Sequence, residues 1–553
     1  MRDERLTVVM TGATGFVGTA LRRGLLPHFR LVGLTRSAAD IGQIMGEKGN
    51  GDETVWRSCD LFSLLELEKT MQGADYAIYL ASARLPSSRL VQGTFEDIDL
   101  IMADNFARAA QFCGVKHILY LGRLIPTEEN LAGLRAGRVE IEQALGSGIT
   151  PLTTLRAGLI VGPGGSSVRI MINLVRRLPV MILPEWTMTQ TQPIAIDDVV
   201  RAVRICLGDP QYFGGRFDIG GPDVMTFREM QERTAGALGK KRVTVAVPHS
   251  APGLSKMWVA LLGGASRYLV GPLVDSLRHP LVAKASPLQA TLVAGAKSFD
   301  VALRESFDKQ GRALPDPREP IRAIDDRAIR RAQRVRSVQR LPLPEGWTAR
   351  QVTAEYYRWL PGAVRPFLRC DIEPWVSVRV CLGFTRWRLI EFTCAPHRSS
   401  EERQLLYITG GALARTKNNA KGRIEFREIL DRRCMLAAIH DYTPTLPWGI
   451  YRYTQALFHL VVMRRFGNHL ARIKAIGMPP EAIKDLALWI LLADGERVRS
   501  ASDRPGQPSE SAAPFSLESL PRGEAPVDPR ASGPAAGLAV RRGSESSSAS
   551  TRN

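Results

Sequence analysis

A glycine-rich turn close to the start of the chain constrains its fold more than any other feature. It lies between an apolar run at residues 6–10 and a helical pattern that begins at Thr19. Three glycines at this spacing let the backbone approach a pyrophosphate, and the N-terminus of the following helix supplies positive partial charge. Because the turn joins a strand to a helix, it predicts a dinucleotide site rather than an ordinary tight turn. The predicted contact residues are Thr11, Gly12, Ala13, Thr14, Gly15, Phe16, Val17 and Gly18.

Strand and helix patterns alternate over the first 160 residues. Strands are expected at residues 6–10, 30–35, 54–58, 76–80, 117–122 and 152–156, and helices at 18–26, 62–71, 100–113 and 137–146. This alternation predicts an α/β fold with a doubly wound, parallel Rossmann sheet. We expect this nucleotide-binding domain to span residues 1–310. It includes a strand near residue 190 that leads into a helix capped by Asp197.

The composition changes twice further along the chain. Residues 311–340 are rich in proline and arginine, which predicts a basic linker or a solvated helix. Residues 341–480 carry alternating strand patterns between 376 and 440, followed by one long amphipathic pattern at 448–473. This order predicts an α+β domain in which a helix packs against a curved sheet. Residues 481–553 are expected to form a disordered tail, because Ser, Pro, Ala, Gly and Arg dominate them from about residue 500.

Charge and cysteine usage narrow the classes of partner. The net charge of +19 favours a solvated, arginine-rich surface, and attraction to an acidic surface is the alternative. No nucleic-acid-binding module is visible, so no nucleic-acid partner is expected. The seven cysteines are scattered, with no CxxC pair and no histidine cluster nearby, which favours free thiols over disulfides or zinc. No secretory signal is visible, and the apolar stretch at 257–277 is interrupted by charges, so a cytoplasmic location is expected.

The end of the second expected strand predicts which nicotinamide cofactor binds. The strand ends in Thr35, Arg36 and Ser37, where an NAD-binding domain of this type carries an acidic residue. Arg36 is suited to pair with a 2′-phosphate, with help from the two hydroxyls. NADP is therefore favoured over NAD, and the alternative is that Arg36 is a solvated loop residue.

Three further segments are candidates for cofactor contact. Asp60, after the third strand, is placed to accept from the adenine amino group while Leu61 packs on the ring; alternatively, Asp60 caps the next helix. Ala81 and Ser82 are small enough to let the cofactor lie near the sheet edge, or they form an ordinary turn. Asn105 either holds backbone geometry near the site or is an exposed polar position.

With these motifs, residues 11–18 resemble the fingerprint of extended and atypical short-chain dehydrogenases/reductases, including the NmrA-like and NAD-dependent epimerase/dehydratase groups. Residues 178–199 resemble a narrower bacterial group that joins such an NAD(P)H-binding domain to a C-terminal domain of unknown function. Residues 335–342 resemble the entry to that second domain, and residues 448–452 and 463–466 resemble its closing helix. The second domain also looks similar to polyketide-cyclase/START-type helix-grip folds. That resemblance implies a cavity for an apolar small molecule.

The chain departs from the reductase pattern where chemistry is expected. The resemblance implies a Tyr-x-x-x-Lys motif on the helix after the fifth strand, but by register Leu134 and Arg138 stand at these positions. Leucine has no proton to give. Arginine holds a hydroxyl or a phosphate but is unsuited to proton transfer. Tyr120 lies in the preceding strand and is expected to pack there, so the catalytic residues are unassigned.

Other charged residues are candidates for the roles that this tyrosine and lysine would fill. Arg123 and Arg156 are candidates to bind an anionic ligand near the nicotinamide. Four carboxylates are conceivable replacement acids, although a solvated position is expected for each: Asp97, Asp99, Glu140 and Glu142.

Three functions remain open at this point. The first is an NADP-dependent oxidoreductase or isomerase whose substrate is partly shaped by the second domain. The second is a non-catalytic NADP(H)-sensing protein, and the third is a lipid or quinone carrier with a regulatory nucleotide domain. The long C-terminal helix carries Arg452, Arg464 and Arg465. Core packing with basic outer residues is favoured for this helix over contact with a membrane surface.

Overall fold

The computed structural model describes residues 5–36, 53–80, 91–126, 132–247, 279–316, 335–373, 377–416 and 422–483. All of them belong to one compact unit, residues 1–498. The expected disordered tail, residues 481–553, lies outside the described residues from residue 484 on, as do the apolar stretch at 257–277 and most of the expected linker. Its first two residues are described and belong to a 3₁₀ turn, so the tail does not begin at residue 481.

The N-terminal half is built on a seven-stranded sheet in which every neighbouring pair of strands is parallel. The predicted doubly wound Rossmann sheet is thereby confirmed. Its order is β12-β7-β6-β4-β1-β2-β3. The strands are β1 (Thr7–Thr11), β2 (Arg30–Thr35), β3 (Val55–Ser58), β4 (Tyr76–Tyr79), β6 (His117–Arg123), β7 (Leu152–Ala157) and β12 (Arg216–Ile219).

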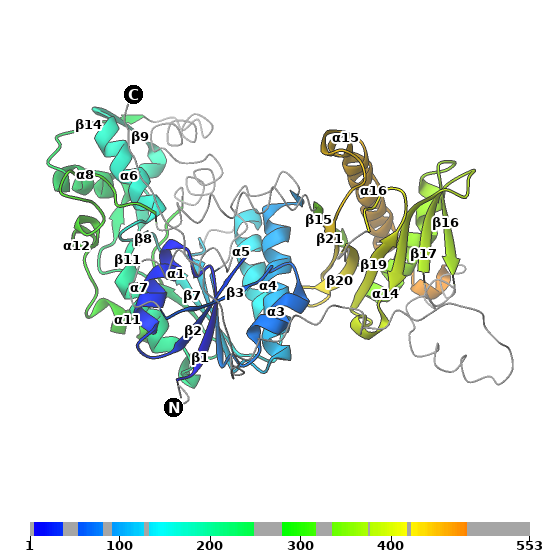
Figure 1. Ribbon diagram of the computed structural model, residues 1–553. Coiled ribbons are helices and arrows are strands. Elements are labelled where there is room, and N and C mark those ends of the chain that lie inside the picture. The colour runs from blue at the N-terminus through cyan, green and yellow to red at the C-terminus, as the bar shows by residue number, and fades with distance from the viewer. Residues whose placement is uncertain are drawn as a thin grey trace, which may run out of the picture. The chain divides into compact units, whose positions relative to one another are not determined.

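Helices cover both faces of this sheet (Figure 1). The first face carries α1 (Phe16–Leu25), α7 (Ile196–Cys206) and α11 (Pro287–Val293), and the second carries α3 (Leu64–Met71), α4 (Phe95–Phe112) and α5 (Ala132–Leu145). The predicted cap at Asp197 is wrong. Strand β11 runs directly into α7, so Ala195 is the N-cap and Asp197 lies in the first turn, where it pairs with Lys297.

Smaller elements complete this half. Three two-stranded sheets and several helices pack around the core that contains Trp186 and Phe227. The strand pairs are β8 (Ile160–Val161) with β11 (Ile194–Ala195), β9 (Val180–Pro184) with β14 (Val243–Val247), and β10 (Gln190–Thr191) with β13 (Met225–Thr226). The helices are α6 (Ser166–Arg177), α8 (Phe227–Ala237) and α12 (Phe299–Arg304), with short 3₁₀ turns at Glu185–Met188 and Pro210–Tyr212.

A second, eight-stranded sheet follows, and all its pairs are antiparallel except β15–β5. β15 begins at Val335, inside the range expected as a linker, whereas β5 comes from the N-terminal half, shortly after β4. The order is β16 (Leu368–Glu373), β17 (Ser377–Leu382), β18 (Arg388–Cys394), β19 (Arg403–Gly410), β20 (Arg423–Ile429), β21 (Cys434–Tyr442), β15 (Val335–Pro342) and β5 (Val91–Gln92).

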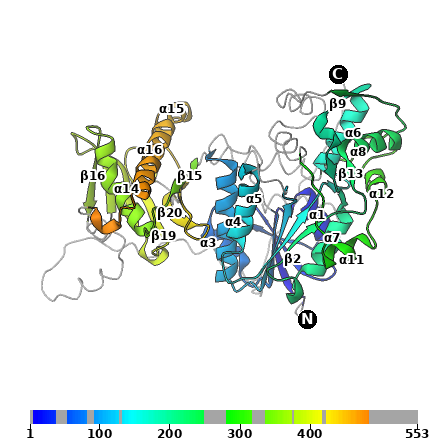
Figure 2. The same ribbon diagram turned by 180° about the vertical axis from the view of Figure 1, so that it is seen from behind.

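This sheet contributes to two hydrophobic cores. Met435 and Ala437 of β21 face a core shared with α14 (Ala349–Ala363) and α16 (Gln455–Ile476). The alternate residues Leu436 and Ala438 face the core that contains α3 and α4 of the nucleotide-binding half. The second sheet is therefore packed between two sets of helices, and it shares a core with the first half (Figure 2).

The C-terminal helical pattern forms two helices rather than the single one expected. α15 (Trp448–Tyr453) ends at Thr454, where the backbone leaves the helical region at φ −120° and ψ −86°, and α16 starts at Gln455. The Thr454 hydroxyl donates to the Ile450 carbonyl oxygen at 2.6 Å, which satisfies one carbonyl of the preceding turn. α16 ends at Gly477, which has a left-handed φ of 61°. A 3₁₀ turn, Pro396–Arg398, and another, Pro480–Ala482, complete the described chain.

Candidate functional site

The glycine-rich turn has the geometry of an anion cradle. Gly12 has φ +65°, which favours glycine, and its carbonyl oxygen accepts from Gly15 N at 2.9 Å. A Cβ at Gly18 would lie only 2.2 Å from Gly12 O, so α1 packs directly against the turn. Gly15 is the N-cap of α1 and provides no side-chain hydrogen bond to the first turn. The residues present therefore fit a pyrophosphate at the N-terminus of α1.

A buried arginine also supports the turn, and no sequence pattern predicts this contact. Arg22 Nε donates to the Ala13 carbonyl oxygen at 3.0 Å, and the guanidinium lies 5.0 Å from the centre of the Trp56 ring. Burial, and secondarily the neighbouring Arg23, lowers the pKa of Arg22 to about 10. The feature of the sequence that could have indicated this buried arginine is its position between Leu21 and Leu25, which are both buried in α1.

Thr35 and Arg36 lie at the same sheet edge as the turn. β2 pairs in parallel with β1, with Leu34 opposite Thr11, so the next two residues follow at the carboxyl end. Arg36 is exposed, and its carbonyl oxygen accepts from the Ser58 hydroxyl at 3.2 Å. Ser37 lies outside the described residues.

The segment after β3 is held by its own side chains. Asp60 Oδ1 accepts from Phe62 N at 3.2 Å, and Asp60 N donates to Glu66 Oε2 at 2.9 Å. The N-cap of α3 is Ser63, so the interpretation of Asp60 as the helix cap is wrong. Ala81 and Ser82 lie outside the described residues, although the preceding Leu80 N donates to Thr11 Oγ1 at 2.9 Å.

Arginines of the second sheet also hold residues 60–62. Arg336 of β15 forms an ion pair with Asp60, and its guanidinium lies 4.5 Å from the centre of the Phe62 ring. Arg423 of β20 donates to the Phe62 carbonyl oxygen at 3.3 Å. These contacts join residues more than 270 positions apart, so no local pattern predicts them.

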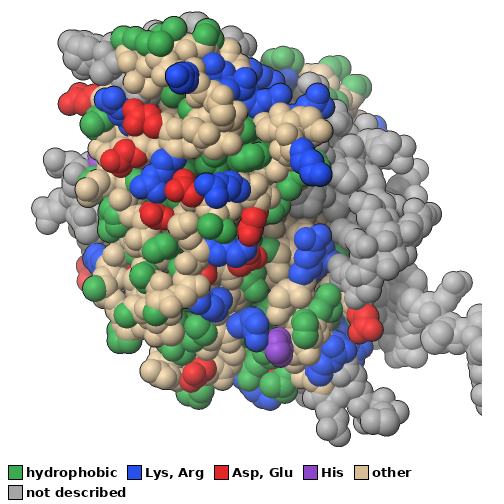
Figure 3. All heavy atoms as spheres, turned by 90° about the vertical axis from the view of Figure 1, so that its left-hand side faces the viewer, with side chains coloured by type: hydrophobic (Ala, Val, Ile, Leu, Met, Phe, Trp, Pro, Cys, Tyr) green, Lys and Arg blue, Asp and Glu red, His purple; other side chains and the backbone are tan. Residues whose placement is uncertain are grey.

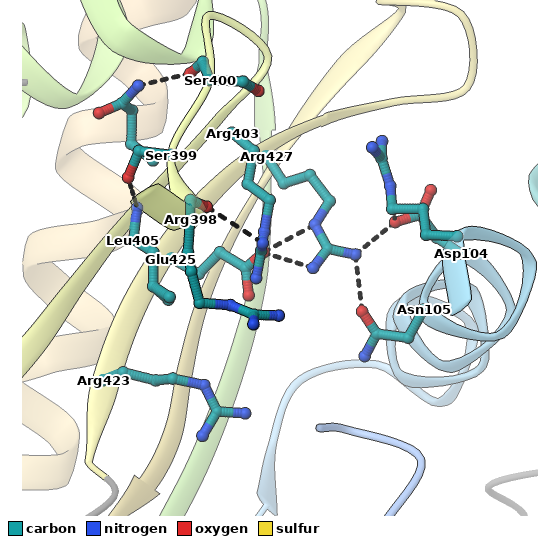
Figure 4. Close-up of polar contacts among 12 residues, drawn as sticks. Asp104, Asn105, Arg398, Ser399, Ser400, Arg403, Leu405, Arg423, Glu425 and Arg427 are labelled. Atoms are coloured by element: carbon teal, nitrogen blue, oxygen red, sulfur yellow. Dashed lines mark hydrogen bonds and ion pairs between the residues drawn. The ribbon is translucent and has the colours of Figure 1, made fainter. Parts of the chain in front are cut away.

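Asn105 connects the same segment to the second sheet. Its Nδ2 donates to the Leu61 carbonyl oxygen at 3.0 Å, and its Oδ1 accepts from Arg427 of β20 at 2.7 Å (Figure 4). Asn105 is buried, so the exposed alternative is wrong. Its bond to Leu61 holds the backbone of this segment, and a place near the cofactor stays a prediction.

Arg427 is the centre of a buried ionic cluster. It pairs with Asp104 of α4 and with Glu425, which also accepts from Arg403 at 2.5 Å (Figure 4). Burial alone would raise the pKa of Glu425, but Arg403 and Arg427 outweigh it and hold this pKa well below its usual value. Burial and the charge of Arg423 lower the pKa of the adjacent His440 to about 4, so this histidine is neutral at pH 7.

The usual positions of the acid and base offer no proton donor in the described side chains. Leu134 lies in α5, and Arg138, also in α5, donates to the Leu124 carbonyl oxygen just after β6. Tyr120 is buried as expected, and burial, followed by the charges of Glu142 and Asp99, raises its pKa well above the usual value.

The expectation that the four candidate carboxylates are solvated is wrong. Glu142 is buried and accepts two hydrogen bonds from Arg156, at 2.8 and 2.6 Å. Arg156, one of the two candidate arginines for an anionic ligand, is therefore paired with a carboxylate of the protein. Arg340 of β15 binds Asp97 at 2.7 Å and Glu140 at 2.8 Å. The sequence could not show these partners. Of the four carboxylates, three are buried and one is partly buried: Asp97, Asp99 and Glu142 are buried, and Glu140 is partly buried.

Comparison with known proteins finds similarity in the N-terminal half of the chain. Residues 8–122 match the model of the NAD dependent epimerase/dehydratase family. The match covers about a fifth of the chain and agrees with the parallel, Rossmann-like sheet of this half. The auxiliary protein GraX of Staphylococcus aureus is 26% identical over 185 residues, which are 33% of this chain and 54% of GraX. The chain thus matches about half the length of this relative.

Solved structures resemble the same half. They include a nucleoside-diphosphate-sugar epimerase from Staphylococcus aureus (18% identity, TM-score 0.43) and an NADPH-dependent quinone oxidoreductase from Escherichia coli (17%, 0.44); each comparison covers 54% of this chain and 100% of the other. The triphenylmethane reductase of Citrobacter sp. (17%, 0.44) covers 55% of this chain and 100% of its own. At this identity the likeness concerns the fold alone. Across the described ranges, no helix combines the length and apolar character that crossing a bilayer requires.

Proposed function

We propose that the N-terminal half binds NADP(H). The observation that carries this proposal is the three-glycine turn. It packs tightly against α1, and the N-terminus of α1 has no side-chain cap. Arg36 supports NADP over NAD, because it follows β2 at the edge where the adenosine ribose binds in folds of this type. Asp60 and Leu61 would lie at the adenine, and Arg138 would lie near the nicotinamide ribose.

The reaction proposed for this site is hydride transfer to an acceptor that needs no proton from a tyrosine, such as a quinone or a flavin. NADPH supplies the hydride when bound. Arg138 contributes by fixing the chain after β6 through the Leu124 carbonyl oxygen, not by moving a proton. Tyr120 stays protonated and packed, because its burial raises its pKa.

A second candidate is a non-catalytic NADP(H) sensor. The observation that favours it is that Arg336, Arg423 and Asn105 connect residues 60–62 to the second sheet, so a shift of this segment on nucleotide binding would reach that sheet. The START-like character of the second domain, with an apolar ligand, stays a prediction from resemblance.

Two measurements test the proposal. The first compares the affinities of NADPH and NADH for the wild type and Arg36→Asp. We expect the variant to lose about tenfold or more in NADPH affinity, because one charge-assisted phosphate contact is replaced by repulsion. Arg30→Asp is the matched control, since Arg30 is also exposed but starts the same strand at its opposite end. Unchanged NADPH affinity in Arg36→Asp would rule out the cofactor assignment.

The second measurement follows NADPH oxidation by the full chain across a panel of quinones, flavins and ketones. The oxidoreductase proposal predicts turnover with quinones or flavins and little with ketones. Nucleotide binding without turnover on any acceptor would favour the sensor instead.

A further inference from the structure

Large apolar side chains lie exposed at one end of the second sheet. In the hairpin between β17 and β18, Phe384 is 87% exposed and Trp387 is 61% exposed. In α15 and α16, Tyr453 is 69% exposed and Leu457 is 51% exposed. An apolar surface that two separate segments contribute to is typical of a binding site.

Backbone hydrogen bonds place the two segments at the same end. Ala412 N donates to the Arg388 carbonyl oxygen, next to the hairpin, and Thr445 N, just before α15, donates to the Leu413 carbonyl oxygen. Figures 1 and 2 likewise show the hairpin and α15 at one end of the sheet. We call residues 383–388, 411–415 and 448–461 the α15 end.

The helices have two apolar sides, and the sheet covers only one. Val462, Met463 and Phe466 are buried in the core. Ile450 and Tyr453 of α15 are exposed, and so are Leu457 and Val461 of α16, each pair at helical spacing within its own helix. The expectation of core packing for this helix is therefore confirmed, but its outer surface is apolar as well as basic.

The charges at the α15 end have one sign. The three segments of the α15 end contain four arginines and no Asp or Glu: Arg386, Arg388, Arg415 and Arg452. Glu391, just beyond the hairpin, lies 2.9 Å from Arg379 and 3.7 Å from Arg388. On the side of the nucleotide-binding half that faces the viewer in Figure 3, both acidic and basic side chains occur.

These observations identify the chemistry of the occupant. Two copies of the chain would bring like charges together, which disfavours self-association through this surface. Exposed Trp, Tyr and Phe beside arginines are the composition of segments that lie at the interface of an anionic bilayer. The guanidinium of Arg452 lies 5.4 Å from the centre of the Tyr453 ring, so a cation and an aromatic ring are presented together.

We propose that the α15 end docks on an anionic lipid surface. Phe384, Trp387, Tyr453 and Leu457 enter the headgroup region, and Arg386 and Arg452 contact lipid phosphates. The docking does not depend on the proposed reaction, although it would bring the chain close to acceptors dissolved in the membrane.

The test is co-sedimentation of the full chain with vesicles of phosphatidylcholine, with and without phosphatidylglycerol. The wild type is expected to bind the anionic vesicles and not the neutral ones. The hairpin variant Phe384→Ser/Trp387→Ser is expected to lower the partition coefficient by about tenfold or more, through loss of inserted apolar area. Arg386→Glu/Arg452→Glu should abolish the preference for phosphatidylglycerol.

Matched controls separate this surface from the overall positive charge. Phe112→Ser/Ile149→Ser removes two aromatic or apolar side chains that are 71% and 85% exposed on the nucleotide-binding half. Lys240→Glu/Lys241→Glu makes the same charge change as the arginine pair at exposed positions after α8. Both controls should bind vesicles like the wild type.

Three outcomes would overturn the proposal. The first is no vesicle binding by the wild type. The second is binding that the hairpin variant leaves unchanged, which would indicate adsorption by net charge alone. The third is equal loss in the control pairs, which would show that the α15 end has no special role. Nucleotide affinity, measured in parallel, should be the same in all these variants, so failure here is distinguishable from failure of the cofactor assignment.

Discussion

Replacing Arg427 with methionine should destabilise the protein strongly. Arg427 is only 1% exposed, and its guanidinium binds Glu425 at 2.8 Å, Asn105 at 2.7 Å and also Asp104. Methionine fills similar space but leaves two buried carboxylates without their shared cation. Removing one partner of a buried pair costs about 3–5 kcal/mol.

The expected loss is near the lower limit, about 3 kcal/mol, because each carboxylate keeps another partner. Glu425 still binds Arg403 at 2.5 Å, and Asp104 still binds Arg108 at 2.9 Å. Urea unfolding followed by circular dichroism measures the effect. With a urea dependence of about 3 kcal/mol per molar, the midpoint should fall by about 1 M.

Arg108→Met is the matched control, because it removes the other cation that binds Asp104. Arg108 is about one-third exposed and lies one helical turn from Asp104, so the expected loss is below about 1 kcal/mol. Equal midpoints for Arg427→Met and the wild type would refute the view that this cluster stabilises the contact between α4 and the second sheet.

Three further predictions follow from the geometry. Gly18→Ala should abolish NADPH binding, because its Cβ would lie 2.2 Å from the Gly12 carbonyl oxygen. Gly236→Ala is the control and should leave binding intact, because nothing lies within 4 Å of a Cβ placed there apart from its chain neighbours and the backbone of its own helix. Titration of both variants with NADPH checks this. Burial lowers the pKa of His117 from 6.5 to about 4. Its neutral form therefore contributes about 3 kcal/mol of stability at pH 7, which is lost as the pH falls from 6.5 to 4. The free energy of unfolding should depend less on pH across this range in His117→Gln, and an identical pH dependence would contradict the assignment. Asn105→Ala should weaken NADPH binding about tenfold by releasing the Leu61 carbonyl oxygen, and unchanged affinity would show that this segment does not contribute to the site.

Local patterns are sufficient for most of the parallel sheet and for the glycine turn. Six of the seven strands of the first sheet overlap the predicted runs, and β2 has the bounds predicted for it. The seventh, β12, was not predicted, because Arg216 and Asp218 alternate with its two apolar residues and leave no apolar run. Gly12 and Gly18 are recognisable because the turn needs a positive φ and a close approach that side chains prevent.

Local patterns do not predict the contacts of the second sheet. β5 is two residues long and pairs with β15 across more than 240 positions, so it has no periodicity to detect. The burial of Glu142 depends on Arg156, a partner from another element, and sequence charge alone favours a solvated position. Arg336 falls in the range whose proline and arginine content predicts a linker or a solvated helix, yet it lies in a strand and pairs with Asp60.

The central claim is that the turn between β1 and α1, with Arg36 beside it, holds NADP(H). Isothermal titration calorimetry of the full chain with NADPH tests this claim most directly. The account predicts saturable binding of one NADPH per chain, tighter than that of NADH. Absence of heat for both nucleotides, even at high excess over folded protein, would contradict it.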